Sequence, residues 1–175
     1  MYCILGAVYI PPRSPSTAYL KFSESVDAVA KKFREQRISL VGNFNLLNAE
    51  WSDVDDLGPV MVASVNASAL EAECIEVVSS ACALHGFTQS YSIQNVHGNL
   101  LDLLLTQFPN VSTREDDGPL LPVDNYHPPL DITIDLYFSH SNNIGLVKNF
   151  TKTLIMQILI ILMNFYLLLT GIGYF

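Results

Sequence analysis

The chain has 175 residues, half of which are hydrophobic, and this is enough apolar material for one domain with a buried core. Its formal net charge is −8 and its pI is about 4.7. Because a domain that grips nucleic acid usually carries a basic face, this composition argues against tight DNA binding by the chain alone. The three cysteines, Cys3, Cys74 and Cys82, have no metal-ligand spacing, which favours buried, reduced thiols in an intracellular protein.

Apolar periodicity predicts interleaved strands and helices along most of the chain. In chain order, the pattern indicates a strand at 2–10, a helix from about 16 to 36, a strand at 38–41, a helix from 66 or 68 to 84, and strands at 87–93, 100–106 and 132–138. Ser16 or Thr17 can cap the first helix, and Gly86 ends the second. The interleaving predicts an α/β fold in which helices cover mixed sheets.

Two acidic segments have the composition of loops. The first, Glu50–Pro59, holds the only tryptophan, Trp51, and the second is Arg114–Gly118. The chain opens directly on an apolar strand that Pro11 and Pro12 end, which is unusual for an independent domain. The sequence therefore suggests a domain without its front half.

Residues 154–175 carry no charge and are numerous enough to cross a bilayer as a helix. Lys148 and Lys152 precede them, so the positive-inside rule would keep the N-terminal side cytosolic. This predicts a hydrophobic C-terminal helix that acts as a membrane anchor. The alternatives are that the tail is a buried segment or that it is translated out of frame. The expected division is a domain at 1–140, a polar linker at 141–153 and the tail at 154–175.

Four short motifs occur in a meaningful order. They are AVYIPP at 7–12, LVGNFN at 40–45, LLDLLLT at 100–106 and VDNYHPPL at 123–130. In this order the chain resembles the C-terminal half of the endonuclease/exonuclease/phosphatase family, in the form found in the polyproteins of non-long-terminal-repeat retrotransposons. The resemblance covers about residues 3–138. It implies a two-sheet α/β sandwich, truncated here, and Mg²⁺-dependent hydrolysis of DNA phosphodiesters.

The resemblance also assigns roles to individual residues. Tyr9 matches the tyrosine that contacts phosphate, and Asn45 matches the asparagine of the Gly-Asp-Phe-Asn turn. Asp102 matches the acidic residue that orients the active-site histidine, which His127 matches. Asp124 matches a metal-binding acid, although the family places that acid directly before the histidine. A divalent cation on carboxylates would neutralise the charge that develops on the phosphate.

Two departures argue that this chain is inactive. Asn43 stands where the family has its catalytic aspartate, and an uncharged amide cannot act as a base. Losing one essential electrostatic group of this kind costs several kcal/mol of transition-state stabilisation. The early asparagine and the metal-binding glutamate of the family belong to the front half, which this sequence lacks. We therefore expect a catalytically inactive fragment in which binding of Mg²⁺ and DNA is weak or absent.

Two other functional hypotheses remain open. The chain could be a tail-anchored membrane protein whose soluble part is an interaction module, which the hydrophobic residues 154–175 favour. It could also be a translated retrotransposon remnant without a selected function. Membrane fractionation tests the first hypothesis, and a divalent-dependent nicking assay tests the enzyme.

Overall fold

The computed structural model describes residues 3–54, 58–90, 92–115, 126, 130–141, 147–158 and 169–172. Within these ranges the chain forms two helices and ten strands, which confirms the mixed α/β class. In chain order the elements are β1 (Cys3–Tyr9), α1 (Ser16–Lys32), β2 (Arg37–Asn43), β3 (Ala49–Val54), β4 (Gly58–Ala63), α2 (Ala69–His85), β5 (Thr88–Gln89), β6 (Asp102–Thr106), β7 (Val111–Glu115), β8 (Leu130–Ser141), β9 (Val147–Ile158) and β10 (Leu169–Ile172).

The described strands form three sheets. The largest has the order β10-β1-β2-β6-β5, the second is the β3-β4 hairpin, and the third has the order β7-β8-β9. β1 and β2 are parallel and are joined through α1, as a parallel pair requires a crossover connection. The other neighbours in the largest sheet are antiparallel.

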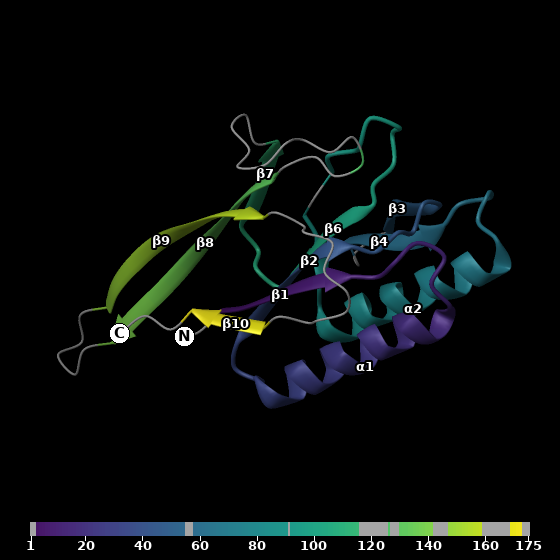
Figure 1. Ribbon diagram of the computed structural model, residues 1–175. Coiled ribbons are helices and arrows are strands. Elements are labelled where there is room, and N and C mark those ends of the chain that lie inside the picture. The colour runs from purple at the N-terminus through teal and green to yellow at the C-terminus, as the bar shows by residue number, and fades with distance from the viewer. Residues whose placement is uncertain are drawn as a thin grey trace.

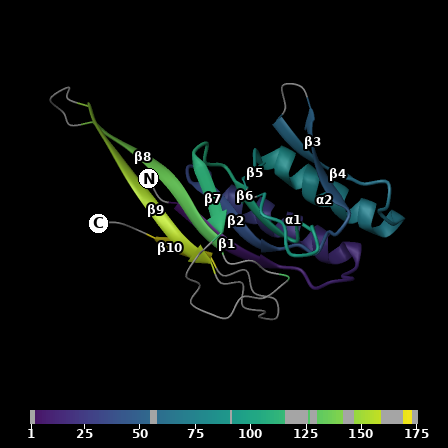
Figure 2. The ribbon, with the colours of Figure 1, turned by 90° about the horizontal axis from the view of Figure 1, so that it is seen from above.

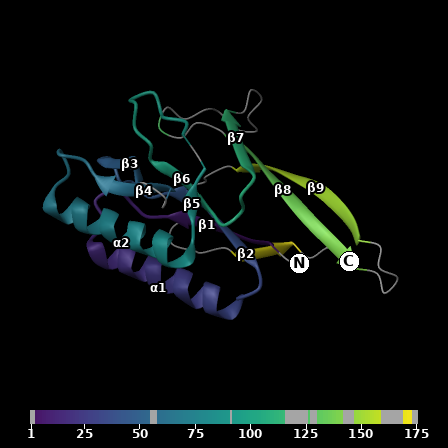
Figure 3. The same cartoon turned by 180° about the vertical axis from the view of Figure 1, so that it is seen from behind.

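The elements are stacked in layers. α1 and α2 lie side by side against one face of the largest sheet, and the β7-β8-β9 sheet lies on its other side (Figure 1). The views from above and from behind show the same order (Figures 2 and 3). The β3-β4 hairpin packs against α2 (Figure 2).

Alternation along the strands divides the core in two, because successive side chains of a strand point to opposite faces. Ile4, Val8 and Ile10 of the first strand region pack in the core beneath the helices. Side chains on the opposite face of the largest sheet pack against the third sheet. This second core consists of the buried residues Cys3, Val41, Leu104, Phe108, Ile132 and Ile134.

Both helices form where the apolar periodicity predicts them, but the ends of α1 differ from the prediction. Gly86 ends α2 with a left-handed φ of 65°, as the sequence predicts. At its start, one of the two predicted positions, Ser68 caps the helix by accepting a hydrogen bond from the Glu71 N–H (3.2 Å). The predicted cap of α1 by Ser16 or Thr17 is wrong. Pro15 occupies that position in an extended conformation and supplies no side-chain hydrogen bond. α1 also ends at Lys32, before the predicted end at Gln36.

The prediction of an acidic loop at Glu50–Pro59 is wrong for its described residues. They belong to the β3-β4 hairpin, in which Trp51 lies opposite Met61. Met61 is buried in the helix-side core, and Trp51 packs against that core. Burial of these two side chains holds the strands in place despite the acidic residues around them. β5 is also shorter than the predicted strand at 87–93.

The hydrophobic tail is not helical where it is described. Residues 154–158 lie in β9, which pairs with β8, and residues 169–172 form β10, which pairs with β1. The predicted C-terminal helix is therefore wrong for these residues, and the rest of the tail lies outside the described ones. Among the residues that the structure describes, there is no helix with the length and apolar character to cross a membrane. Membrane insertion stays a prediction.

All three cysteines are buried and none forms a disulfide, as their spacing predicts. Burial disfavours the thiolate, and it raises the pKa of Cys82 to about 12 and that of Cys3 to about 11. These thiols therefore serve as small apolar groups of the core rather than as nucleophiles.

Removing residues 147–175 is expected to make the protein aggregate. The deletion removes β9 and β10, so β8 loses one partner strand and β1 becomes an open edge with unpaired N–H and C=O groups. Light scattering and a thermal melt of residues 1–146 measure the effect. Residues 1–158, which keep β9, serve as the intermediate control. A monomeric 1–146 with a sharp cooperative melt would contradict the bracing role of β9 and β10.

Candidate functional site

Three of the residues singled out in the sequence lie side by side at one end of the largest sheet. Tyr9 is opposite Asn43 in the parallel β1-β2 pair, and Asn43 is opposite Asp102 in the antiparallel β2-β6 pair. Directly opposite residues of neighbouring strands share a face of the sheet. Tyr9, Asn43 and Asp102 therefore form one row across three neighbouring strands, which we call the polar row.

The polar row faces away from the helices. Val41 and Leu104, two positions along β2 and β6 from Asn43 and Asp102, pack in the core against the third sheet. Asn43 and Asp102 are both only 2% exposed, and Tyr9 is half-buried. A buried carboxylate and a buried amide are costly unless hydrogen-bonded, so this end of the sheet is a polar site enclosed by apolar packing.

A glycine allows β1 and β2 to approach closely at this end. Gly42 lies opposite Val8, and a Cβ atom added to it would be 1.7 Å from the Val8 carbonyl oxygen. No side chain can be accommodated at that distance without moving the backbone. The glycine of the LVGNFN motif is thus required by the close strand pairing that brings Tyr9 beside Asn43.

Asn45 lies in the turn after β2 and ties that turn to the end of β1. Its backbone has a left-handed φ of 51°, which asparagine tolerates better than most residues. Its N–H donates to Oδ1 of Asn43 (2.8 Å), and its Nδ2 donates to the Ile10 carbonyl (2.8 Å). The Ile10 N–H in turn donates to the Asn43 carbonyl (2.9 Å). Both asparagines therefore hold the turn in place.

Asp124 and His127 lie outside the described residues, so their expected places in the site are not part of this structure. Tyr126 is described, and its ring lies 5.1 Å from that of His97, measured between centroids. His97 belongs to the loop between β5 and β6. Oδ1 of the buried Asn95 shapes that loop by accepting from the N–H groups of His97 and Asn99, both at 3.0 Å. No local pattern in the sequence predicts this contact between His97 and Tyr126, which lie in separate segments of the chain.

The described residues of the site do not form a complete magnesium site by themselves. Mg²⁺ prefers six oxygen ligands in near-octahedral geometry, with one or two carboxylates among them. Among the described candidates, Asp102 supplies a carboxylate, while Oδ1 of Asn43 already accepts the Asn45 N–H. No group of three or more His, Cys, Asp or Glu side chains that could hold a metal occurs in the described part of the chain.

Comparison of this chain with protein-family models, with curated proteins and with solved structures finds no match.

Replacing Asn43 by alanine is expected to lower the free energy of unfolding by about 1–3 kcal/mol, because the variant loses a buried acceptor and leaves the Asn45 N–H without it. Asn43→Asp keeps an acceptor oxygen, so it should retain this hydrogen bond. Urea unfolding measures both variants. Asn66→Ala, at an exposed asparagine, is the matched control. Equal stability of Asn43→Ala and Asn66→Ala would show that the Asn43 side chain does not hold the turn.

Proposed function

We propose that this chain derives from a divalent-metal-dependent DNA endonuclease of the endonuclease/exonuclease/phosphatase type, as in non-long-terminal-repeat retrotransposons, and that it is catalytically inactive. The observation that carries the proposal is the polar row. Three residues that the resemblance assigns to one site, from motifs up to 93 positions apart (Tyr9 to Asp102), lie directly opposite one another on neighbouring strands. Such convergence at strand ends is typical of catalytic sites.

The layering supports the same proposal. The family's domain is a sandwich of two sheets between helices, and this chain has two helices, a mixed sheet and a second antiparallel sheet stacked in that order (Figures 1 and 2). We propose that these layers correspond to the C-terminal half of such a sandwich. The tail strands β9 and β10 then cover edges of both sheets.

The proposed roles follow from the chemistry of the side chains. The Tyr9 hydroxyl would donate to a phosphate oxygen, and Asp102 would orient the His127 imidazole, which would donate to another. Asp124 would be a ligand of the metal in the parent enzyme. The ring of Tyr126 lies against that of His97, in the loop before β6, which begins at Asp102.

The same site explains the proposed inactivity. At the catalytic position Asn43 offers an uncharged amide, whose oxygen already accepts the Asn45 N–H. An amide neither deprotonates water nor compensates a cation's charge, so both general-base and electrostatic contributions are lost. The net charge of −8 further opposes approach of a DNA backbone.

The purified full chain is expected to show no Mg²⁺-dependent nicking of supercoiled plasmid. Agarose electrophoresis over long incubations measures it, with EDTA as the metal-free control and His127→Ala as the matched variant. Nicking that requires Mg²⁺ and disappears in His127→Ala would overturn the proposed inactivity. Nicking that persists in His127→Ala comes from a contaminating nuclease and leaves the proposal standing.

A further inference from the structure

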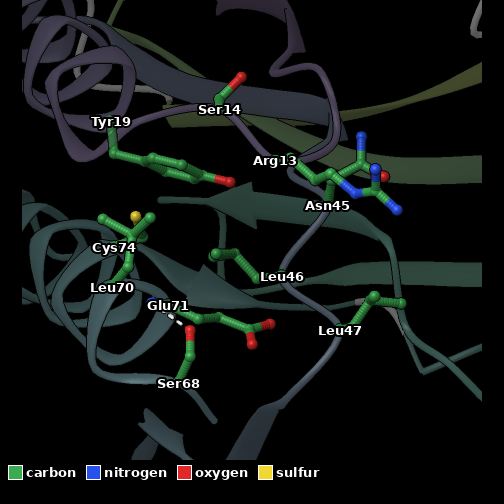
Figure 4. Close-up of a pocket in the computed structure, with 10 residues that line it drawn as sticks. All are labelled: Arg13, Ser14, Tyr19, Asn45, Leu46, Leu47, Ser68, Leu70, Glu71 and Cys74. Carbon is green, nitrogen blue, oxygen red and sulfur yellow. Dashed lines mark hydrogen bonds between the residues drawn. The ribbon is translucent and has the colours of Figure 1, made fainter.

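A pocket on the helix side of the turn after β2 is separate from the polar row. It has a volume of ≈ 240 Å³ and lies between the segment before α1, the turn itself and the first turn of α2. In Figure 4, Arg13 and Asn45 lie along one side, Ser68 and Glu71 along the opposite side, and Leu46 between them. The polar row faces the other sheet, and Asn45 is the described residue of the expected site that also lines this pocket.

Apolar side chains form the floor and rim of the pocket. Leu46, Cys74 and the ring of Tyr19 are buried at its base, at 3%, 2% and 2% exposure. Leu47 and Leu70 stand at the rim with 56% and 50% of their surface exposed. Two half-exposed leucines beside a concave apolar floor are a surface that an apolar ligand would cover favourably.

Most polar groups of the pocket already have protein partners. Both carboxylate oxygens of Glu71 accept from Asn48, one from its N–H (2.9 Å) and one from its Nδ2 (2.7 Å). The Tyr19 hydroxyl donates to the Phe44 carbonyl (2.8 Å). The Ser14 hydroxyl donates to the Pro11 carbonyl (2.7 Å). These groups define the walls, and their hydrogen bonds keep them from turning toward a ligand.

Arg13 is the exception. Arg13 lines the pocket, is exposed, and makes no hydrogen bond or ion pair within the described part of the chain. It follows Pro11-Pro12 in a loop closed by the Ser14 N–H donating to the Pro11 carbonyl (3.3 Å). The first turn of α1, directly after this loop, contains no acidic residue that could neutralise it. The pocket therefore has one available cation at its rim, beside an apolar floor.

We propose that this pocket binds a small carboxylate with an unbranched apolar chain, the carboxylate at Arg13 and the chain along Leu46, Leu47 and Leu70. The volume of ≈ 240 Å³ corresponds to roughly eight water-sized groups of about 30 Å³, which is the size of a six-carbon fatty acid. Arginine binds carboxylates through paired N–H donors, which fixes the anionic end. The carboxylate lies away from Glu71, whose like charge disfavours the reverse orientation.

The proposal is tested by titrating the full chain with hexanoate and measuring its binding by ligand-observed saturation-transfer NMR. Hexanoate is expected to bind with a millimolar dissociation constant, as suits so few atoms. Hexylamine has the same chain and the opposite charge. It should bind at least about fivefold more weakly, because the Arg13 guanidinium repels its ammonium group. Equal binding of the two probes, or no hexanoate binding at tens of millimolar, would overturn the assignment.

Three variants locate the site. Arg13→Ala should weaken hexanoate about fivefold or more and leave hexanol unchanged, whereas Leu70→Ala should weaken both. Arg34→Ala removes an exposed arginine outside the pocket and should change neither. Arg13→Lys keeps the charge and should retain part of the affinity. If Arg13→Ala and Arg34→Ala behave alike, the anion does not bind at Arg13 and the proposal fails.

Discussion

The close parallel pairing of β1 and β2 at Val8 and Gly42 is the constraint on which the described fold depends. Any Cβ at position 42 would lie 1.7 Å from the Val8 carbonyl oxygen, so the pairing tolerates glycine alone without a backbone shift. In the same strand register, Tyr9 lies opposite Asn43, and Asn43 lies opposite Asp102. The same register directs alternate residues to the helices and to the third sheet, so one contact sets both the packing and the site.

Stability and chemistry compete at the polar row. In an active enzyme of the proposed family, the position of Asn43 would carry a carboxylate next to Asp102, and two buried carboxylates repel each other unless a cation lies between them. The amide removes that repulsion and instead accepts the Asn45 N–H, which stabilises the turn without a metal. In the proposed account, the amide at position 43 therefore has two effects: it removes the catalytic carboxylate, and it stabilises this end of the sheet.

Local patterns predicted much of the fold. The strand at the N-terminus, both helices and the Gly86 end follow from periodicity and turn chemistry, and the structure contains them. The β3-β4 hairpin was missed because its acidic residues resemble a loop, while the burial of Met61 that holds it is a tertiary effect. The tail was predicted as a helix because residues 154–175 are uncharged and numerous enough to cross a bilayer. Its pairing with β1 depends on a partner far away in the sequence, whereas its pairing with β8 forms a hairpin of consecutive strands.

The sequence names candidate site residues but does not predict how they are arranged. The ordered motifs named Tyr9, Asn43 and Asp102, but only the strand register shows that they are neighbours. A cross-strand disulfide tests that register most directly. Ser39 and Thr106 lie opposite each other on β2 and β6, on the same face as the polar row, with 2.6 Å between Oγ and Oγ1. The variant Ser39→Cys with Thr106→Cys should therefore oxidise readily to a disulfide that peptide mapping identifies, and Ser39→Cys with Leu104→Cys should not. Preferential cross-linking of the second pair would mean that β6 is shifted by two residues, that Asp102 is not opposite Asn43, and that the polar row does not exist.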